Sequence, residues 1–409
     1  MMYLLQLVVV LALFHFSSAD VVADPEAYMT AIDLIKYWGY PAEEHEVHTA
    51  DGYILNLFRI PHGRRSRTNS SCRRPAILLV HGMAGGASEF LLNPPPSCPA
   101  FLLADAGFDV FLMNHRGTTY SKRHESLKEW DNKYWQWTLD EMARYDSPAV
   151  IDRVLEISGE KGVYWVGHSQ GTAMGYMTLA DSPEYNSKVK GLFQLAPQGS
   201  GGYTTGIIRA AFWLYETAKP VVDFYRIALG SHEVSFQFPL VYRPLVRLCN
   251  IIPGGDQICD YATHYLFGPS SRTLNITRAP VYLSHIPSGT STWNALHWAQ
   301  LAVRRTVEHM DHNPAENVRR YGSETPPRYN YSRIDVPIYH FLGDADYLGT
   351  KAEMDNVLLK MLRKEVVKEL IIIPGYNHID YVVADDCAEM VFNPIATIVR
   401  NQESGMCEH

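Results

Sequence analysis

The sequence has 409 residues, of which 46% are hydrophobic and 20% are charged, and its formal net charge at pH 7 is −8. This composition is typical of an ordinary globular chain and argues against a disordered one. No basic block is present, so we expect no nucleic-acid partner.

The first 19 residues have the pattern of a signal peptide. An apolar run from Leu4 to Phe14 is followed by Ser17 and Ala19, which form a small-x-small cleavage site. The alternative is a membrane anchor, but the run is shorter than the ~20 residues that a helix needs to span a bilayer. We therefore expect cleavage after about Ala19, and an exported chain without a transmembrane anchor.

Export would allow glycosylation and disulfide bonds. Asn-x-Ser/Thr sequons occur at Asn69, Asn275 and Asn330. Among the six cysteines, Cys249 and Cys259 close the shortest loop, so this pair is the first choice for a disulfide. The remaining cysteines are open to pairing or to being free buried thiols: Cys72, Cys98, Cys387 and Cys407.

The first 200 residues alternate between predicted strands and helices. Residues 25–40 read as a short helix, and residues 46–60 as a β-hairpin with a two-residue turn at Asp51-Gly52. A continuous apolar run at 76–80 then predicts a strand that is buried on both faces, and further strands are predicted at 109–113, at 163–166 before the Gly-x-Ser-x-Gly motif, and at 191–197. Helices are expected between them, at 100–106, from Pro148 onwards and at 170–180.

This alternation indicates an α/β fold with a mostly parallel sheet. It stops between 198 and 333, where the sequence is helical and irregular with no clear strand. Two apolar faces in this segment, Ile207 to Tyr215 and Val221 to Leu229, suggest a cap over one edge of the sheet. Strands resume at 336–342 and 369–373, and a helix at 387–400 closes the fold.

The predicted organisation therefore has five parts. They are a signal peptide at 1–19, a first part of the α/β core at 20–197, a cap or lid at 198–333, a second part of the core at 334–400, and a tail at 401–409.

Gly167-His168-Ser169-Gln170-Gly171 follows the apolar run at 163–166. This Gly-x-Ser-x-Gly pattern is typical of a nucleophile elbow, where a strand turns sharply into a helix and exposes a serine on the turn. Each glycine is expected where a side chain would collide with the neighbouring strand or helix. Ser169 is thus the candidate nucleophile.

A serine hydroxyl needs a base, and the base needs an acid to orient it. In folds with this elbow, both partners follow the serine in chain order, acid first. His378 follows a predicted strand and is the candidate base, whereas His340 lies inside a strand. The acid candidates are Asp344 and Asp346, which follow the strand at 336–342.

Two backbone N–H groups are expected to bind the oxyanion that forms during acyl transfer. One belongs to Gln170, directly after the nucleophile, and the other lies in the loop after the strand at 76–80, where Met83 is the choice. This chemistry implies neither a metal nor a cofactor.

The chain resembles the acid lipases, the gastric and lysosomal acid lipase group of the α/β-hydrolase fold, over nearly its whole mature length. The resemblance rests on Leu103–Val110, Arg116-Gly117, Ser121–His124, Asp140–Asp146, Gly167–Gly171, His297–Gln300, Thr325–Tyr329 and Asn377–Tyr381. It implies that Asp346 is the acid, with Asp344 as the alternative, and that 198–333 is a cap with a mobile lid. It also implies a disulfide between Cys249 and Cys259.

The resemblance further implies a secreted or lysosomal serine lipase. Such an enzyme hydrolyses triacylglycerols, steryl esters or both, at a lipid–water interface. Two alternatives are a carboxylesterase for small soluble esters and a non-catalytic lipid-binding protein. The chain departs from the family at Met113-Asn114-His115, where a glycine and a small residue are usual, and at Met83, where leucine is usual. These departures bear on substrate preference more than on activity.

Overall fold

The computed structural model describes residues 24–65, 72–218, 232–234, 261, 263–269 and 275–406. Several predictions fall outside these residues. They concern the signal peptide at 1–19, Asn69, Cys249, Cys259, Cys407 and the apolar face from Val221 to Leu229. None of the helices in the described part of the chain is both long and apolar enough to cross a membrane.

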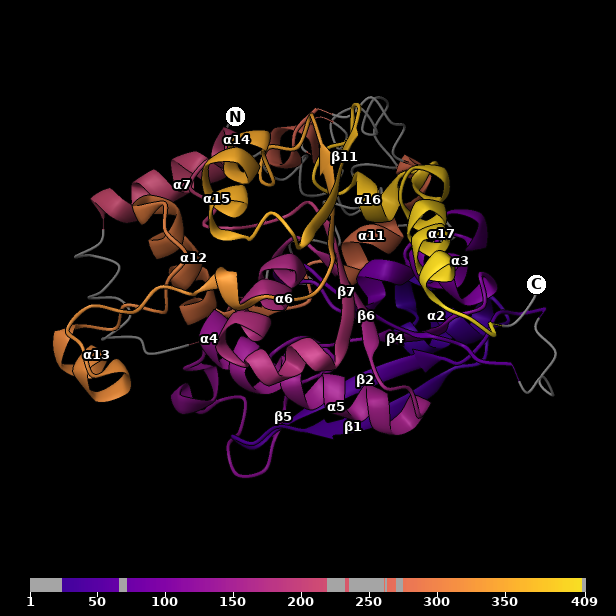
Figure 1. Cartoon of the computed structure of the whole chain (residues 1–409), viewed down its shortest axis with the longest axis horizontal. Helices are drawn as coiled ribbons and strands as arrows, with labels where there is room; N and C mark the ends of the chain where they lie inside the picture. Colours follow the sequence, from indigo (N-terminus) through magenta and orange to yellow (C-terminus); the bar gives the residue numbers. More distant parts are fainter. Residues whose placement is uncertain are drawn as a thin grey trace, which may run out of the picture.

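A nine-stranded sheet forms the centre of the molecule (Figure 1). Its strands are β1 (Glu43–His48), β2 (Tyr53–Ile60), β3 (Ala76–Val80), β4 (Asp109–Leu112), β5 (Arg123–His124), β6 (Val163–His168), β7 (Val189–Leu195), β10 (Ile338–Gly343) and β11 (Val367–Ile373). The order is β1-β2-β4-β3-β6-β7-β10-β11, with β5 paired to β2. All neighbours from β4 to β11 are parallel, whereas β1, β2 and β5 pair antiparallel. The prediction of a mostly parallel α/β sheet is confirmed.

Helices cover both faces of this sheet. The α-helices are α2 (Ala31–Tyr37), α3 (Pro99–Asp105), α4 (Leu139–Glu141), α5 (Ser147–Ser158), α6 (Gln170–Asp181), α7 (Gly206–Thr217), α11 (Ala279–His285), α12 (Thr292–Arg304), α13 (Pro314–Tyr321), α14 (Lys351–Glu353), α15 (Leu359–Met361), α16 (Asp380–Val383) and α17 (Asn393–Gln402).

Two hydrophobic cores result, one on each face. Leu78 and Val80 of β3 pack with α5 and α6, whereas Ile77 and Leu79 pack on the opposite face with α2, α3 and α17. All five residues of β3 are fully buried, which explains why its sequence is continuously apolar rather than alternating. Each of the four larger side chains, those of Ile77 to Val80, contributes about 1.5–3 kcal/mol of stability through burial.

Three details differ from the sequence predictions. The β1–β2 connection is a longer loop than the predicted two-residue turn, because the Thr49 N–H donates to the Tyr53 carbonyl (2.9 Å). The predicted helix at 25–40 is split, since Thr30 forms a capping box that starts α2 separately from the 3-10 turn η2 (Pro25–Tyr28). The segment 198–333 also contains two short paired strands, β8 (Glu233–Val234) and β9 (Thr290–Ser291).

The cysteines that the structure describes fall into two groups. Cys98 and Cys387 are free and buried, and their Sγ atoms lie 3.2 Å from the carbonyl oxygens of Phe90 and Ser97. Burial raises the pKa of the Cys98 thiol to about 12, so it is not a reactive thiolate at neutral pH. Cys72, by contrast, is disulfide-bonded.

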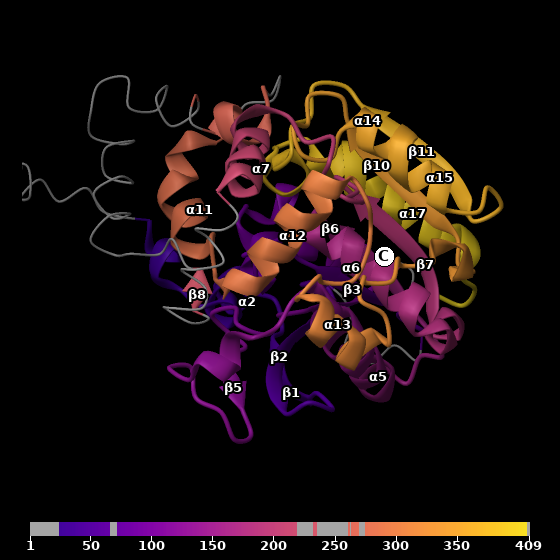
Figure 2. The ribbon, with the colours of Figure 1, turned by 90° about the vertical axis from the view of Figure 1, so that its left-hand side faces the viewer.

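Helices α7, α11 and α12 of the predicted cap lie across the sheet edge at which β3 and β6 end (Figure 2). Helix α12 packs on α7. It also reaches the core, because the Trp298 Nε1–H donates to Gln170 Oε1 (2.7 Å) at the start of α6.

Residues 309–329 of this segment dock on Asp140 at the start of α4. The Asp140 carboxylate accepts hydrogen bonds from the Met310 N–H (2.9 Å) and the Tyr329 hydroxyl (2.6 Å). Nδ1 of His309 lies 3.3 Å from Asp140, and Nε2 lies 3.5 Å from Asp181. A histidine between two carboxylates therefore holds this part of the chain to the core.

Replacing His309 with glutamine is expected to reduce the pH dependence of stability on the alkaline side. Burial lowers the pKa of His309, but Asp140 and Asp181 outweigh it and raise the pKa from 6.5 to about 9. The charged histidine therefore stabilises the fold fully below about pH 6.5, and this contribution is lost as the pH rises through about 9. The shift corresponds to about 3 kcal/mol, or about 3–5 °C in Tm.

Thermal unfolding at about pH 6 and about pH 10 measures this effect. The wild type should lose more Tm over this range than His309→Gln does. His48→Gln, at a histidine whose side chain is 56% exposed, is the control and should behave as the wild type. Equal pH dependence of Tm in wild type and His309→Gln would contradict the prediction.

Candidate active site

Ser169 lies on a sharp turn between β6 and α6. Its backbone has φ 51° and ψ −119°, a conformation that costs free energy for a residue with a side chain. Such strain is typical of a nucleophile elbow, since it turns the hydroxyl away from both elements. Ser169 is half-buried, whereas its neighbours His168 and Gln170 are buried.

The two glycines of the motif allow this turn. A Cβ atom on Gly167 would lie 2.5 Å from the carbonyl oxygen of Gly171, and one on Gly171 would lie 2.1 Å from the carbonyl oxygen of Val80. Both distances are far inside van der Waals contact. The first turn of α6 therefore packs directly against the end of β6 and against β3 only because both side chains are missing.

Ser169, His378 and Asp346 form a continuous hydrogen-bonded chain. Nε2 of His378 lies 2.8 Å from Oγ of Ser169, and Nδ1 lies 3.0 Å from each carboxylate oxygen of Asp346. Oδ1 of Asp346 also accepts the N–H groups of Leu348 (2.7 Å) and Gly349 (2.9 Å), which fix the carboxylate in place. All three residues follow the carboxyl ends of parallel strands β6, β10 and β11, where sites of open α/β sheets form.

The structure distinguishes the two acid candidates by their contacts. Asp344 is exposed, and its Oδ1 accepts the N–H of Gly375 (2.7 Å) in the turn after β11. Asp346 is buried and contacts the His378 ring. Asp346 therefore occupies the place of an orienting acid.

The loop after β3 lies beside the nucleophile. A Cβ atom on Gly82 would lie 3.2 Å from Cβ of Ser169, so the backbone approaches closely here. Met83 follows, with a side chain that is 38% exposed. On the other side of Ser169, Gln170 is the first residue of α6, where N–H groups have no acceptor within the helix. The loop that carries Met83 and the first residue of α6 therefore both adjoin the serine.

The segment 263–269, whose contacts the sequence did not signal, touches both the acid and the base. The carbonyl oxygen of Phe267 accepts the N–H of His378 (3.3 Å) and the N–H of Tyr347 (3.2 Å). The Phe267 ring is parallel to the His378 ring, with centroids 6.1 Å apart. The Asn377 side chain donates to the carbonyl of Gly268 (2.9 Å). One short segment of the predicted cap thus contacts both the loop that carries Asp346 and the loop that carries His378.

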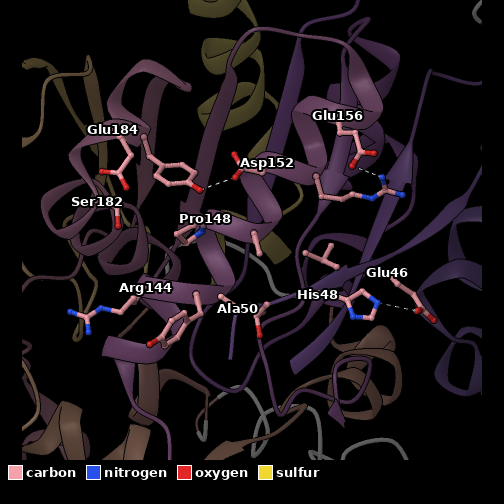
Figure 3. Close-up of a pocket in the computed structure, with 15 residues that line it drawn as sticks. Glu46, His48, Ala50, Arg144, Pro148, Asp152, Glu156, Ser182 and Glu184 are labelled. Atoms are coloured by element: carbon pink, nitrogen blue, oxygen red, sulfur yellow. Dashed lines mark hydrogen bonds and ion pairs between the residues drawn. The ribbon is translucent and has the colours of Figure 1, made fainter. Parts of the chain in front are cut away.

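A groove lies elsewhere, between β1, α5 and the segment after α6 (Figure 3). Some of its ionic side chains are paired: Arg153 pairs with Glu156, and Asp152 accepts from Tyr185 (2.8 Å) and from Lys188 outside the lining (2.5 Å). Ser169, Asp346 and His378 are not among its lining residues. The acyl-transfer geometry therefore belongs to the sheet edge and not to this groove.

Two known protein families match parts of this chain. Residues 31–94 match the family described as a partial alpha/beta-hydrolase lipase region. Residues 75–305 match the alpha/beta hydrolase fold. Together these matches span β3, β6 and the nucleophile elbow.

Relatives that align over almost the whole chain are lipases. The chain is 35% identical over 382 residues to lipase lipl-1 of Caenorhabditis elegans, covering 93% of each chain. It is 36% identical to lipase member K of Homo sapiens and to gastric triacylglycerol lipase of Bos taurus, covering 92% of each chain in both cases.

A solved structure gives the same fold at lower identity. Lip1 from Acinetobacter baumannii aligns with a TM-score of 0.50 and 14% identity, over 91% of this chain and 96% of that chain. At this identity the likeness concerns the fold alone.

Proposed function

Because the chain belongs to the lipase family of α/β hydrolases, we propose that it hydrolyses lipid esters through Ser169, His378 and Asp346. It is a carboxylic ester hydrolase. The proposed substrates are triacylglycerols, steryl esters or both. The observation that carries the proposed site is the hydrogen-bonded chain from the Ser169 hydroxyl through the His378 ring to the Asp346 carboxylate.

In the first half-reaction, Oγ of Ser169 attacks the ester carbonyl carbon while Nε2 of His378 takes the hydroxyl proton. The N–H groups of Met83 and Gln170 donate to the oxyanion of the tetrahedral intermediate. Asp346 holds the imidazole and stabilises its charged form. The carbon–oxygen bond to the alcohol then breaks, and His378 protonates the leaving alcohol.

The second half-reaction repeats these steps with water. His378 takes a proton from water as the water attacks the acyl carbonyl. The bond to Ser169 breaks, His378 returns the proton to Oγ, and the carboxylic acid leaves. The ester and one water molecule are the only reactants, and the chain supplies the nucleophile, the base, the acid and the oxyanion donors.

Exposed apolar side chains near the site support action at a lipid–water interface. On α7, Trp213 is 61% exposed and Leu214 is 60% exposed. In the adjacent segment, Tyr265 is 66% exposed, and a Cβ on Gly206 at the start of α7 would lie 3.6 Å from its carbonyl oxygen. Exposed apolar side chains that gather on one face mark a surface that binds an apolar partner, and we propose this role for α7.

This patch is joined to the proposed acid. The Thr205 N–H, one residue before α7, donates to the carbonyl of Tyr347 (2.7 Å), which is next to Asp346. A lipid surface that contacts α7 would therefore lie beside the residues that react.

Replacing Trp213 with serine should lower activity on emulsified triacylglycerol by about 5- to 30-fold, because burial of a large side chain in lipid is lost. Hydrolysis of a short soluble ester should change little, since no interface is involved. The measurement is the rate of acid release in a pH-stat on emulsified triacylglycerol, emulsified steryl ester and a soluble short-chain ester. Trp130→Ser is the control, because Trp130 is 82% exposed and comes six residues after β5, a strand that lies far from α7 in Figures 1 and 2.

The results with the three substrates distinguish the proposed function from its alternatives. Activity on the soluble ester alone, with no rise beyond its solubility limit, would identify a carboxylesterase for small esters instead. If none of the three substrates is hydrolysed, the alternative of a non-catalytic lipid-binding protein is favoured. Equal losses in Trp213→Ser and Trp130→Ser on emulsions would exclude a specific role for α7.

We also propose that the protein is secreted or lysosomal and carries glycans. Asn330 is exposed, and the Ser332 hydroxyl of its sequon lies 2.6 Å from its side-chain oxygen. Asn275 is half-buried and bonds Thr277 in the same way, also at 2.6 Å. Enzymatic removal of N-glycans should lower the mass of protein taken from the medium of expressing cells.

A further inference from the structure

A buried glutamate and a buried histidine are hydrogen-bonded to each other next to the proposed triad. Oε1 of Glu89, in the 3-10 turn η3 (Ala87–Leu91), is 2.6 Å from Nδ1 of His168, the last residue of β6. Each side chain is only 5% exposed. The proposed mechanism uses neither group, although His168 directly precedes Ser169 in the chain.

The hydrogen bonds define how the pair is ionised. Nε2 of His168 lies 2.8 Å from the backbone carbonyl of His378, an oxygen that can only accept, so Nε2 carries a proton. The N–H of Gly82 lies 3.2 and 3.1 Å from the two oxygens of Glu89, which favours the carboxylate. A second proton on Nδ1 then satisfies the contact between the two side chains.

The pKa shifts of both side chains agree with this ionisation. Burial lowers the pKa of His168, but the charge of Glu89 and the hydrogen bonds outweigh it and raise the pKa above its usual range. Burial raises the pKa of Glu89, but the charge and hydrogen bond of His168 outweigh it and lower the pKa. Both directions favour the form of the pair in which His168 is an imidazolium and Glu89 a carboxylate.

Three parts of the site meet at this pair. Glu89 holds the N–H of Gly82, the residue before the proposed oxyanion donor Met83. His168 continues into the nucleophile turn and holds the backbone of His378. The hydrogen-bonded path Gly82–Glu89–His168–His378 therefore runs behind Ser169 and links the donor loop to the base. A misplacement of about 1 Å in such groups costs about 100-fold in rate.

We infer that Glu89 and His168 are positioning residues, which hold the oxyanion loop and the base in register with Ser169. The inference rests on the proposed function. Within the described residues, the Ser169 hydroxyl is hydrogen-bonded to His378, whereas Glu89 and His168 bond to Gly82, to each other and to the His378 carbonyl. Their effect is therefore expected in the rate of the chemical steps and not in substrate binding.

Substitutions at Glu89 test this inference. Glu89→Ala removes the acceptor for Gly82 and the partner of His168, so kcat for a soluble short ester should fall by about 10- to 100-fold with little change in KM. Glu89→Gln keeps an acceptor for Gly82, and its amide can donate to Nδ1 of a neutral His168 that still donates from Nε2. It should retain kcat within about 10-fold of the wild type.

A matched control separates positioning from stability. Glu26 is another buried glutamate in an ion pair, with both of its oxygens held by Arg278 (3.0 and 2.9 Å), and it is remote from the triad in its contacts. Glu26→Ala should lower Tm and leave kcat unchanged. Inactivation of Ser169 by an active-site phosphonate gives a second readout, which should slow in Glu89→Ala and not in Glu26→Ala.

The outcomes separate the inference from the proposed function. Hydrolysis of the soluble ester by the wild type tests the function alone. Wild-type kcat and inactivation rate in folded Glu89→Ala would overturn the inference while the function stands. So would a loss of kcat in Glu26→Ala as large as that in Glu89→Ala. If Glu89→Ala does not fold, Glu89→Ser is measured in its place, since serine is too short to reach both Gly82 and His168.

Discussion

Ser169→Ala is expected to lower kcat for ester hydrolysis by about 10⁵-fold or more, because the acyl-enzyme can no longer form. Alanine keeps the Cβ atom and so places no new demand on the backbone at φ 51°. The fold should survive, with Tm close to that of the wild type. Hydrolysis of a soluble ester and thermal unfolding are measured on the same preparation.

The chain supplies a matched serine for this experiment. Ser182 caps the carboxyl end of α6, the helix that Ser169 precedes, and it does not contact His378. Ser182→Ala should retain wild-type kcat. Retention of activity in Ser169→Ala, or an equal loss in both variants, would show that Ser169 is not the nucleophile.

Asp346→Asn should lower kcat by about 10³–10⁴-fold. Asparagine would donate from its amide toward Nδ1 of His378, which would place the ring proton on Nε2, opposite the Ser169 hydroxyl. A histidine in that tautomer cannot accept the serine proton. The asparagine side chain has nearly the same size as that of aspartate, so KM and the fold should be little affected.

Asp344→Asn is the control for the acid. Asp344 lies two residues earlier in the same loop, is exposed, and accepts the Gly375 N–H rather than contacting His378. Its replacement should change kcat by less than about threefold, as surface substitutions usually do. A larger loss in Asp344→Asn than in Asp346→Asn would assign the acid to the other residue.

The strands could be predicted from sequence because the sheet buries both of its faces. Burial on both sides makes 76–80 and 163–166 continuously apolar, so the runs end where the polar turns begin. The candidate nucleophile, acid and base follow such runs directly, and their meeting at one edge is a consequence of parallel strands. The α/β fold was therefore readable, and so was the sheet edge at which the three candidate residues meet.

Contacts between distant loops were not readable in this way. Glu89 lies in the short stretch Ala87–Leu91, with no periodicity that marks it as a partner of His168, 79 residues later. Phe267 belongs to a segment without a strand or motif, and it acts through its carbonyl oxygen, which every residue has. A backbone contact leaves no signature in side-chain identity, so no pattern of residues could reveal it.

The shared acceptor at Phe267 bears on how this chain can be divided or recombined. One carbonyl oxygen from the inserted segment accepts N–H groups from the loops of both the acid and the base. An excised or exchanged 198–333 segment would leave the backbone N–H groups of His378 and Tyr347 without this acceptor. We therefore expect that the predicted cap is not an interchangeable accessory, and that a chimera with a foreign segment would need a carbonyl at this same point to keep Asp346 and His378 aligned.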